Sequence, residues 1–286
     1  MVVTRTVEEL QEALTALVSS KGNDGGLVPT MGALHEGHAS LMALALETNA
    51  WVATTIFVNP LQFNHLADWV RYPRCEKEDF IFLKEQGVDL VFAPTPDEVF
   101  PFDWVAPELD LGGLDLQLEG AFRPGHFKGV AIVVGRLLDL IPCASLYMGL
   151  KDYQQCLVVE RLLLLRKGMS GQEGPVMVKV PTVRDGDGLA LSSRNLLLGP
   201  DQLARAKGIA RTWAWMKTVW QGLEPQDLIE NALKRLTAEG LRNEYLYLAR
   251  DGGLEPWVKG DGNPRALYAG WLDEVRLIDN ELFSIV

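Results

Sequence analysis

The chain has 286 residues, of which 48% are hydrophobic, and its formal net charge is −11 at pH 7. This length and apolar content are enough for a large core and for two domains. The acidic charge disfavours binding to nucleic acid or to an anionic membrane surface, because those surfaces attract clustered Lys and Arg. We therefore expect any anionic substrate to be bound by a local group of cations.

The N-terminal segment and the cysteines favour a cytoplasmic protein. Residues 1–20 have the apolar spacing of an ordinary helix, and every apolar run is interrupted by polar residues before it reaches membrane-spanning length. Cys75, Cys143 and Cys156 are odd in number and widely spaced, which fits a reducing compartment better than a disulfide framework. We expect inert thiols, no signal segment and no membrane span.

Up to about residue 183, strand-like apolar runs alternate with segments of helical spacing. The predicted elements are strands at 26–28, 51–58, 88–93, 146–148 and 176–180, and helices at 40–46, 75–86, 128–140 and 153–167. Such alternation indicates βαβ units and a parallel sheet with helices on both faces. The sequence thus predicts an α/β fold in which ligands bind at the carboxyl ends of the strands.

The pattern changes after about residue 184. Residues 186–188 form a glycine-rich turn, and the segments beyond it are predicted helices at 200–220 and 225–240 and β-rich segments at 243–250 and 266–279. We place a domain boundary near Val183. This gives a first domain of residues 1–183 and a smaller second domain of residues 184–286.

Two histidines, His35 and His38, lie three residues apart where a predicted strand leads into a predicted helix. A helix N-terminus presents unpaired N–H groups and a partial positive charge, so an anion can bind there. Gly32 and Gly37 let the backbone approach such an anion closely. The segment therefore predicts a nucleotide phosphate site.

A P-loop is a poor match to the same segment. Gly32 and Gly37 have its spacing, but His38-Ala39 stands where that motif needs Lys followed by Ser or Thr. This disfavours a P-loop ATPase, and no kinase module is expected within these residues.

Zinc binding and core hydrogen bonding are the other interpretations of the histidine pair. A zinc site could also use His126, but no cysteine spacing supports such a site. Zinc would moreover leave three predicted neighbours without anions to bind, namely Lys151, Arg184 and Arg194. Zinc is therefore disfavoured, and a structural role for the histidines stays open.

Further polar segments are expected close to the histidines. Residues 29–31, 59–63 and 149–152 each follow a predicted strand, so a parallel sheet would bring them to one edge. The loop at 119–129 carries His126 and two cations. Residues 191–195 add two hydroxyls and an arginine suited to closing over phosphate oxygens, although a helix cap explains the serines equally well.

Together these motifs resemble the pantoate–β-alanine ligase family, in order and through both predicted domains. The matching segments are residues 28–38, 57–63, 72–74, 118–129, 149–155, 180–184, 187–195 and 276–280. The family belongs to the nucleotidyltransferases with a His-x-Gly-His signature, here His35-Glu36-Gly37-His38, which class I aminoacyl-tRNA synthetases share. The resemblance implies a Rossmann-like domain, a smaller α+β C-terminal domain and a homodimer.

The resemblance also implies a reaction in two steps. ATP and (R)-pantoate would give pantoyl adenylate and pyrophosphate, and the amine of β-alanine would then form pantothenate and release AMP. Adenylation converts a poor acyl donor into one with a stable leaving group. In-line displacement at phosphorus needs positioning and charge neutralisation more than a protein nucleophile.

By resemblance, the catalytic residues are His38 as proton donor, His35 on the phosphates, and Lys151 and Arg194 as cations. The substrate-binding residues are Gln62, Gln155 and Asn59. Mg²⁺ is expected to bridge phosphates, with Asp79 as the first candidate for its acidic ligand and Glu78 as the second. A solvated helix face is the other interpretation of this acidic pair. The residues expected to contact ATP are Met31, Gly32, Ala33, Leu34, His35, Glu36, Gly37, His38, Gly149, Leu150, Lys151, Asp152, Val183, Leu191, Ser192, Ser193 and Arg194.

The chain departs from the family pattern at two places. The family loop before Lys151 usually reads Gly-Glu-Lys-Asp, and Leu150 replaces the glutamate here. We expect activity to survive this change. The segment 66–70 is also unusual because it contains Trp69, and we expect it to alter a surface loop.

Two alternative functions remain open. One is another nucleotidyltransferase of the same signature class, such as a cytidylyltransferase. The other is a nucleotide-binding homologue that has lost turnover through Leu150. A tRNA synthetase is disfavoured by the acidic charge and by the absence of an anticodon-binding extension.

Overall fold

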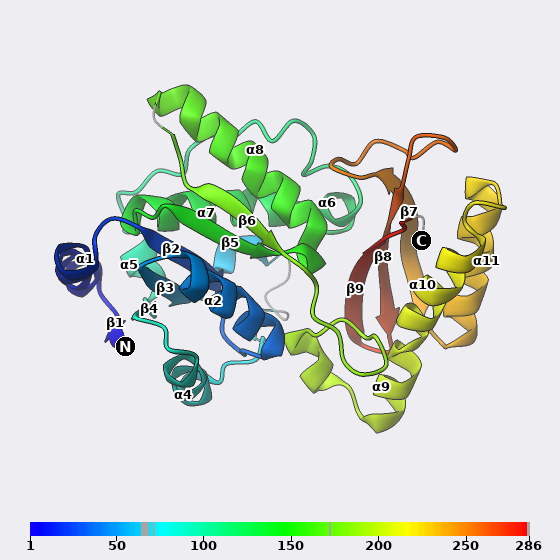
Figure 1. The fold of residues 1–286 in the computed structure, drawn as a ribbon, viewed down its shortest axis with the longest axis horizontal. Coiled ribbons are helices and arrows are strands. Elements are labelled where there is room, and N and C mark those ends of the chain that lie inside the picture. The colour runs from blue at the N-terminus through cyan, green and yellow to red at the C-terminus, as the bar shows by residue number, and fades with distance from the viewer. Residues whose placement is uncertain (64–68, 71, 172, 285–286) are drawn as a thin grey trace. The chain divides into compact units, whose positions relative to one another are not determined.

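The computed structural model describes residues 1–63, 69, 70, 72–171 and 173–284, so residues 66–68 of the unusual segment lie outside the described residues. The chain packs as two compact units (Figure 1). The first unit contains residues 1–150 and 155–180, and the second contains residues 151–154 and 181–286.

Over the described residues, six parallel strands form the sheet of the first unit in the order β1-β4-β3-β2-β5-β6. Their bounds are β1 (Val2–Thr4), β2 (Gly25–Thr30), β3 (Trp51–Ile56), β4 (Leu90–Phe92), β5 (Ser145–Gly149) and β6 (Val176–Val180). Strands β3, β2 and β5 are neighbours, so their carboxyl ends meet at one edge of the sheet. This confirms the expected common edge for the segments that follow them.

Helices cover both faces of this sheet. They are α1 (Val7–Lys21), α2 (Glu36–Thr48), α4 (Glu76–Gln86), α5 (Pro96–Val99), α6 (Glu119–Phe122), α7 (His126–Leu140) and α8 (Tyr153–Ser170), with short 3₁₀ turns η1 (Pro60–Gln62) and η2 (Leu150–Asp152). Successive strand residues point to opposite faces: Leu27 packs with α1, α7 and α8, whereas Val28 packs with α2 and α4. The predicted α/β class is therefore confirmed.

Local signals explain where several elements begin. Thr6 and Glu9 form a reciprocal capping box that starts α1. Strand β1 was not predicted, because it has only three residues and forms by pairing with β4, far along the chain. Its pairing partner, not its own pattern, decides its structure.

The second unit is an antiparallel sheet packed against helices. The sheet order over the described residues is β7 (Arg242–Arg250), β8 (Pro264–Leu272) and β9 (Val275–Leu282). The helical elements are η3 (Ser193–Leu197), α9 (Pro200–Ala206), α10 (Gly208–Val219) and α11 (Pro225–Ala238). Trp213 packs edge-on against Tyr268 and Phe283 in the core between these layers.

Two predicted elements of this unit differ from the structure. The single helix expected at 200–220 is broken at Lys207, and a Cβ on the following Gly208 would lie 2.4 Å from the Glu239 side chain. The β-rich segment at 266–279 is a hairpin that turns at Asp273, whose φ is +52°. The β-rich prediction at 266–279 is thus confirmed as two strands joined by a turn, whereas the helix prediction at 200–220 joined two helices into one.

Within the described ranges, no helix combines the length and the apolar character needed to cross a membrane.

Candidate active site

His35 and His38 are held by hydrogen bonds at the start of α2. His35 is the N-cap residue, and its Nδ1 accepts the N–H of Gly37 at 3.1 Å. Nδ1 of His38 accepts the N–H of His35 at 3.2 Å, and the two ring centroids are 4.2 Å apart. A neutral imidazole that accepts at Nδ1 carries its proton on Nε2. Both half-buried rings therefore have an Nε2–H donor at a helix N-terminus, where anions bind favourably.

The loop before the histidines has an unusual backbone. Gly32 and Ala33 both have positive φ, +79° and +51°. Asp79, from the first turn of α4, is buried and accepts the N–H of Ala33 at 2.9 Å and that of Leu34 at 2.8 Å. Burial raises the pKa of Asp79, and the two N–H donors oppose that rise. Asp79, the predicted Mg²⁺ ligand, is thus hydrogen-bonded to two backbone N–H groups.

The predicted substrate residues Asn59 and Gln62 contact each other. Both are buried, and Asn59 Nδ2 donates to Gln62 Oε1 at 3.1 Å. Gln62 Nε2 donates to Sδ of Met31 at 2.9 Å. These bonds connect the turn after β3 with the end of β2, as the shared sheet edge requires.

His126, which the disfavoured zinc interpretation included, supports Gln62 from α7. Its Nδ1 lies 2.8 Å from the carbonyl oxygen of Gln62, and its Nε2 lies 3.1 Å from Nη1 of Arg123. Gly129, one turn later, is in close contact with the same 3₁₀ turn, since a Cβ there would be 2.3 Å from the Leu61 oxygen. The sequence signal for this support was the cationic, glycine-rich loop.

A pocket in the second unit collects the predicted phosphate cations. Lys151 and Arg194 both line it, together with Ser192 and Arg276. Nζ of Lys151 lies 3.5 Å from Oδ1 of Asp152. Three cations and a hydroxyl in one pocket suit a polyanion such as a nucleotide phosphate chain. Its remaining lining residues are Leu189, Ala190, Asn195, Ile209, Leu277, Ile278 and Asp279.

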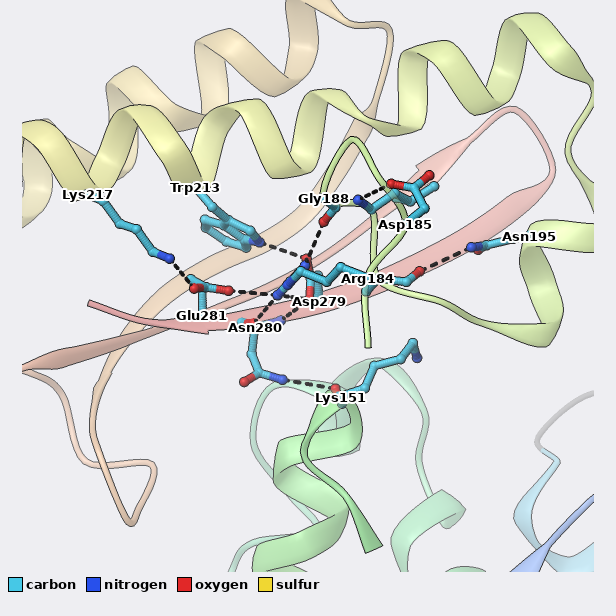
Figure 2. A network of polar contacts seen from close by, with 12 residues as sticks. Lys151, Arg184, Asp185, Gly188, Asn195, Trp213, Lys217, Asp279, Asn280 and Glu281 are labelled. Carbon is cyan, nitrogen blue, oxygen red and sulfur yellow. Dashed lines mark hydrogen bonds and ion pairs between the residues drawn. The ribbon is translucent and has the colours of Figure 1, made fainter. Parts of the chain in front are cut away.

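A polar network lies beside this pocket and includes a hydrogen bond to the backbone of Lys151 (Figure 2). Asn280 Nδ2 donates to the Lys151 carbonyl oxygen at 3.0 Å. Arg184 binds Asp279 at 2.7 Å and Glu281 at 2.7 Å. Burial alone lowers the pKa of Arg184, but these two carboxylates outweigh it and raise the pKa above its ordinary value. Arg184, expected near the phosphates, therefore has protein anions as partners.

The remaining predicted ATP and pantoate residues lie in both units of the chain. The carbonyl oxygen of Val183 accepts the N–H of Leu191 at 2.9 Å, which joins the two segments assigned to ATP. Gln155 is half-buried at the start of α8 in the first unit, whereas Lys151 and Asp152 pack with the second. Among the residues with described positions, no three His, Cys, Asp or Glu side chains gather as a metal-binding group.

The chain is similar to known proteins over nearly its whole length. A family model described as pantoate–β-alanine ligase matches residues 2–282. The pantothenate synthetase of Cereibacter sphaeroides (strain ATCC 17029) is 42% identical over 281 residues, covering 97% of this chain and 98% of that protein. The pantothenate synthetase of Thermus thermophilus is 42% identical over 282 residues, covering 96% and 98%.

Solved structures agree with these sequence matches. The crystal structure of pantothenate synthetase from Thermus thermophilus has a TM-score of 0.90 at 40% identity and covers 100% of both chains. The pantoate–β-alanine ligase of Francisella tularensis, complexed with βγ-ATP and β-alanine, has a TM-score of 0.80 at 30% identity and covers 99% of this chain and 97% of that one. The chain therefore belongs to the pantoate–β-alanine ligase family and is a ligase.

Proposed function

We propose that this ligase condenses (R)-pantoate with β-alanine to give pantothenate, in two steps that convert ATP to AMP and pyrophosphate. The paired Nε2–H donors of His35 and His38 at the start of α2 carry this assignment. They suit phosphate oxygens better than a metal, because the two Nδ1 lone pairs already accept backbone N–H groups. The Francisella relative, complexed with βγ-ATP and β-alanine, supports the choice of substrates.

In the first step, a carboxylate oxygen of pantoate attacks the α-phosphorus of ATP, and the bond to the bridging oxygen of pyrophosphate breaks. The products are pantoyl adenylate and pyrophosphate. His38 and His35 would donate hydrogen bonds to the phosphate oxygens as charge develops on them. The proposed proton-donor role of His38 would be this hydrogen bond from Nε2–H, because a neutral imidazole does not release its remaining proton. No covalent intermediate with the protein is needed.

The second unit would supply the cations for the same step. Lys151 and Arg194 line one pocket, and their positive charges would balance the departing pyrophosphate. Ser192 and Ser193 belong to the same proposed phosphate-binding segment, and Asp152 would hold the ribose. Ser192 Oγ also accepts the N–H of Arg194 at 3.2 Å, so this hydroxyl caps the 3₁₀ turn η3 as well.

In the second step, the β-alanine amine attacks the acyl carbon, the bond to the AMP oxygen breaks, and the amine nitrogen loses a proton. Gln62 and Gln155 would bind pantoate, and Gln62 would also contact β-alanine, because an amide both donates and accepts hydrogen bonds. Asn59 would act mainly by orienting the Gln62 amide, to which it is bonded.

Mg²⁺ belongs to this proposal as an ion carried by the ATP phosphates. The described side chains do not fit a magnesium site built by protein alone, because no group of three possible ligands occurs among them. When bound, the ion would neutralise phosphate charge.

The cytoplasmic location and the homodimer are also proposals, supported by resemblance to the family. Sedimentation equilibrium at several concentrations tests the dimer, for which a mass of twice 31.7 kDa is expected. A sedimenting mass equal to one chain would contradict it. Fractionation of the source cells tests the location.

Exchange of labelled pyrophosphate into ATP tests the reaction. We expect exchange when ATP and pantoate are present without β-alanine, and none when pantoate is omitted. Exchange only with CTP would favour a cytidylyltransferase-like enzyme instead. Nucleotide binding without any exchange would favour a homologue that has lost turnover. His38→Ala should abolish most of the exchange, and near-normal exchange in that variant would refute its assigned role.

A further inference from the structure

Asp79 is a buried carboxylate aimed at the backbone of another segment. It lies in the first turn of α4, is 2% exposed, and is 45 or 46 residues from its partners in sequence. One oxygen accepts the N–H of Ala33 at 2.9 Å and the other accepts the N–H of Leu34 at 2.8 Å. A bidentate contact of this kind fixes both the position and the direction of the loop that it binds.

The bound loop has a backbone that would not persist without support. Ala33 has a φ of +51°, a left-handed conformation that a residue with a Cβ rarely adopts. Gly32 has a φ of +79°, and a Cβ added to it would lie 2.8 Å from Oδ2 of Asp79. The carboxylate thus occupies the space next to Gly32 while it holds the N–H of Ala33.

The loop leads directly into the histidine turn. Leu34 is followed by His35, which caps α2 and whose own N–H is bonded to Nδ1 of His38. If Ala33 relaxed out of the left-handed region, the chain direction at Leu34 would change, and both imidazoles would move with it. The position of the two Nε2–H donors therefore depends on the carboxylate from α4.

We propose that Asp79 is a positioning residue, which clamps the backbone of Ala33 and Leu34 so that His35 and His38 meet the phosphates of ATP. Its carboxylate accepts two backbone N–H groups and does not bind Mg²⁺. The consequence for catalysis rests on the proposed function, whereas the clamp itself is a statement about the free protein.

Asp79→Asn tests the clamp with nearly unchanged shape. The amide oxygen of asparagine can accept one of the two N–H groups, but its NH₂ cannot accept the other. We expect the KM and the Kd for ATP to rise about tenfold or more, with pantoate KM and the Mg²⁺ activation constant at saturating ATP unchanged. Glu85→Gln, which removes an exposed carboxylate from the same helix, is the control and should behave like the natural chain.

Gly32→Ala disturbs the contact between Asp79 and the Ala33 loop from the side of the loop. It introduces a Cβ 2.8 Å from Asp79 Oδ2 at a positive φ, so ATP binding should weaken with Mg²⁺ activation again unchanged. Thermal unfolding shows whether Asp79→Asn is folded. If it is not, Gly32→Ala tests the proposal in its place. A raised Mg²⁺ activation constant in Asp79→Asn, or ATP binding unaffected in both variants, would overturn the proposal.

Amide hydrogen exchange separates the clamp from the proposed function. By NMR, the amides of Ala33 and Leu34 should be protected in the natural chain and should exchange faster in Asp79→Asn. Unprotected amides in the natural chain would refute the clamp even if the enzyme were active. If the amides are protected but the enzyme shows no pantoate-dependent exchange of pyrophosphate into ATP, the clamp is supported and the proposed function is refuted.

Discussion

Nδ1 of His126 lies 2.8 Å from the carbonyl oxygen of Gln62, and this contact fixes the protonation of the ring. A carbonyl only accepts, so Nδ1 must carry a proton. Nε2 lies 3.1 Å from Nη1 of Arg123, and a guanidinium only donates, so Nε2 must accept. His126 is therefore a neutral imidazole that holds the backbone of Gln62, whose side chain is oriented separately by Asn59.

Replacing His126 should weaken substrate binding through Gln62. In His126→Asn, the amide NH₂ can take the place of Nδ1–H and retain the bond, whereas His126→Ala cannot. We expect His126→Ala to raise the KM for pantoate about tenfold, in keeping with loss of a buried hydrogen bond worth roughly 1–3 kcal/mol, and His126→Asn to recover most of this loss. Steady-state kinetics with varied pantoate measure both. Equal defects in the two variants would contradict the hydrogen-bonding role.

Gly129→Ala should destabilise the first unit and displace the turn that carries Gln62. The new Cβ would lie 2.3 Å from the Leu61 carbonyl oxygen, which belongs to the backbone and cannot move aside alone. We expect a loss of about 1–3 kcal/mol in the free energy of unfolding. Gly135→Ala in the same helix is the control, since its nearest contact is 3.7 Å from a Leu162 methyl group, and it should be neutral or slightly stabilising. Urea unfolding followed by circular dichroism compares them.

Asp279→Ala should destabilise the second unit. Its carboxylate binds Arg184 at 2.7 Å and accepts from Trp213 Nε1 at 2.8 Å, and its side chain is 2% exposed. Its removal leaves Arg184 with Glu281 as the remaining carboxylate and leaves the buried Trp213 N–H without its acceptor, at a cost of about 1–3 kcal/mol. Asp187→Asn breaks the exposed ion pair with Lys207 and should have almost no effect. A similar unfolding midpoint for the two variants would contradict the importance of the buried network.

The Cys143 thiol should resist alkylation in the folded protein. Burial raises its pKa to about 12, so almost no thiolate is present at pH 8. Iodoacetamide followed by mass spectrometry should label Cys143 only after denaturation. Because the thiol ionises at lower pH in the unfolded chain, its contribution to stability is lost as the pH rises from about 9 to about 12. Rapid labelling at pH 8 without unfolding would disagree with this assignment.

Leu150→Glu should change ATP affinity only modestly. Leu150 opens the 3₁₀ turn η2, and the neighbouring Lys151 is held there through its backbone carbonyl by Asn280. That support does not depend on the side chain at position 150. Kinetics with varied ATP measure the effect, and a gain in kcat/KM of roughly a hundredfold or more would show that the leucine impairs the reaction.

Local patterns predicted most of the elements of the first unit. The apolar runs behind β2, β3 and β5, and the helical spacing of α2, α7 and α8, each lie within a short window of sequence. The His35-Glu36-Gly37-His38 signature was equally visible, because its residues are adjacent. β1 was missed because it forms by pairing with β4, which lies far along the chain.

The sequence by itself determined the α/β class, the family and the segments that hold the proposed site, since these depend on neighbouring residues and their order. Tertiary structure alone decided that Asp79 binds the Ala33 loop, that His126 supports Gln62 and that Asn280 holds Lys151. These pairs lie 46, 64 and 129 residues apart. A hydrogen bond between such residues forms only after the sheet and helices have packed, so no local pattern encodes it.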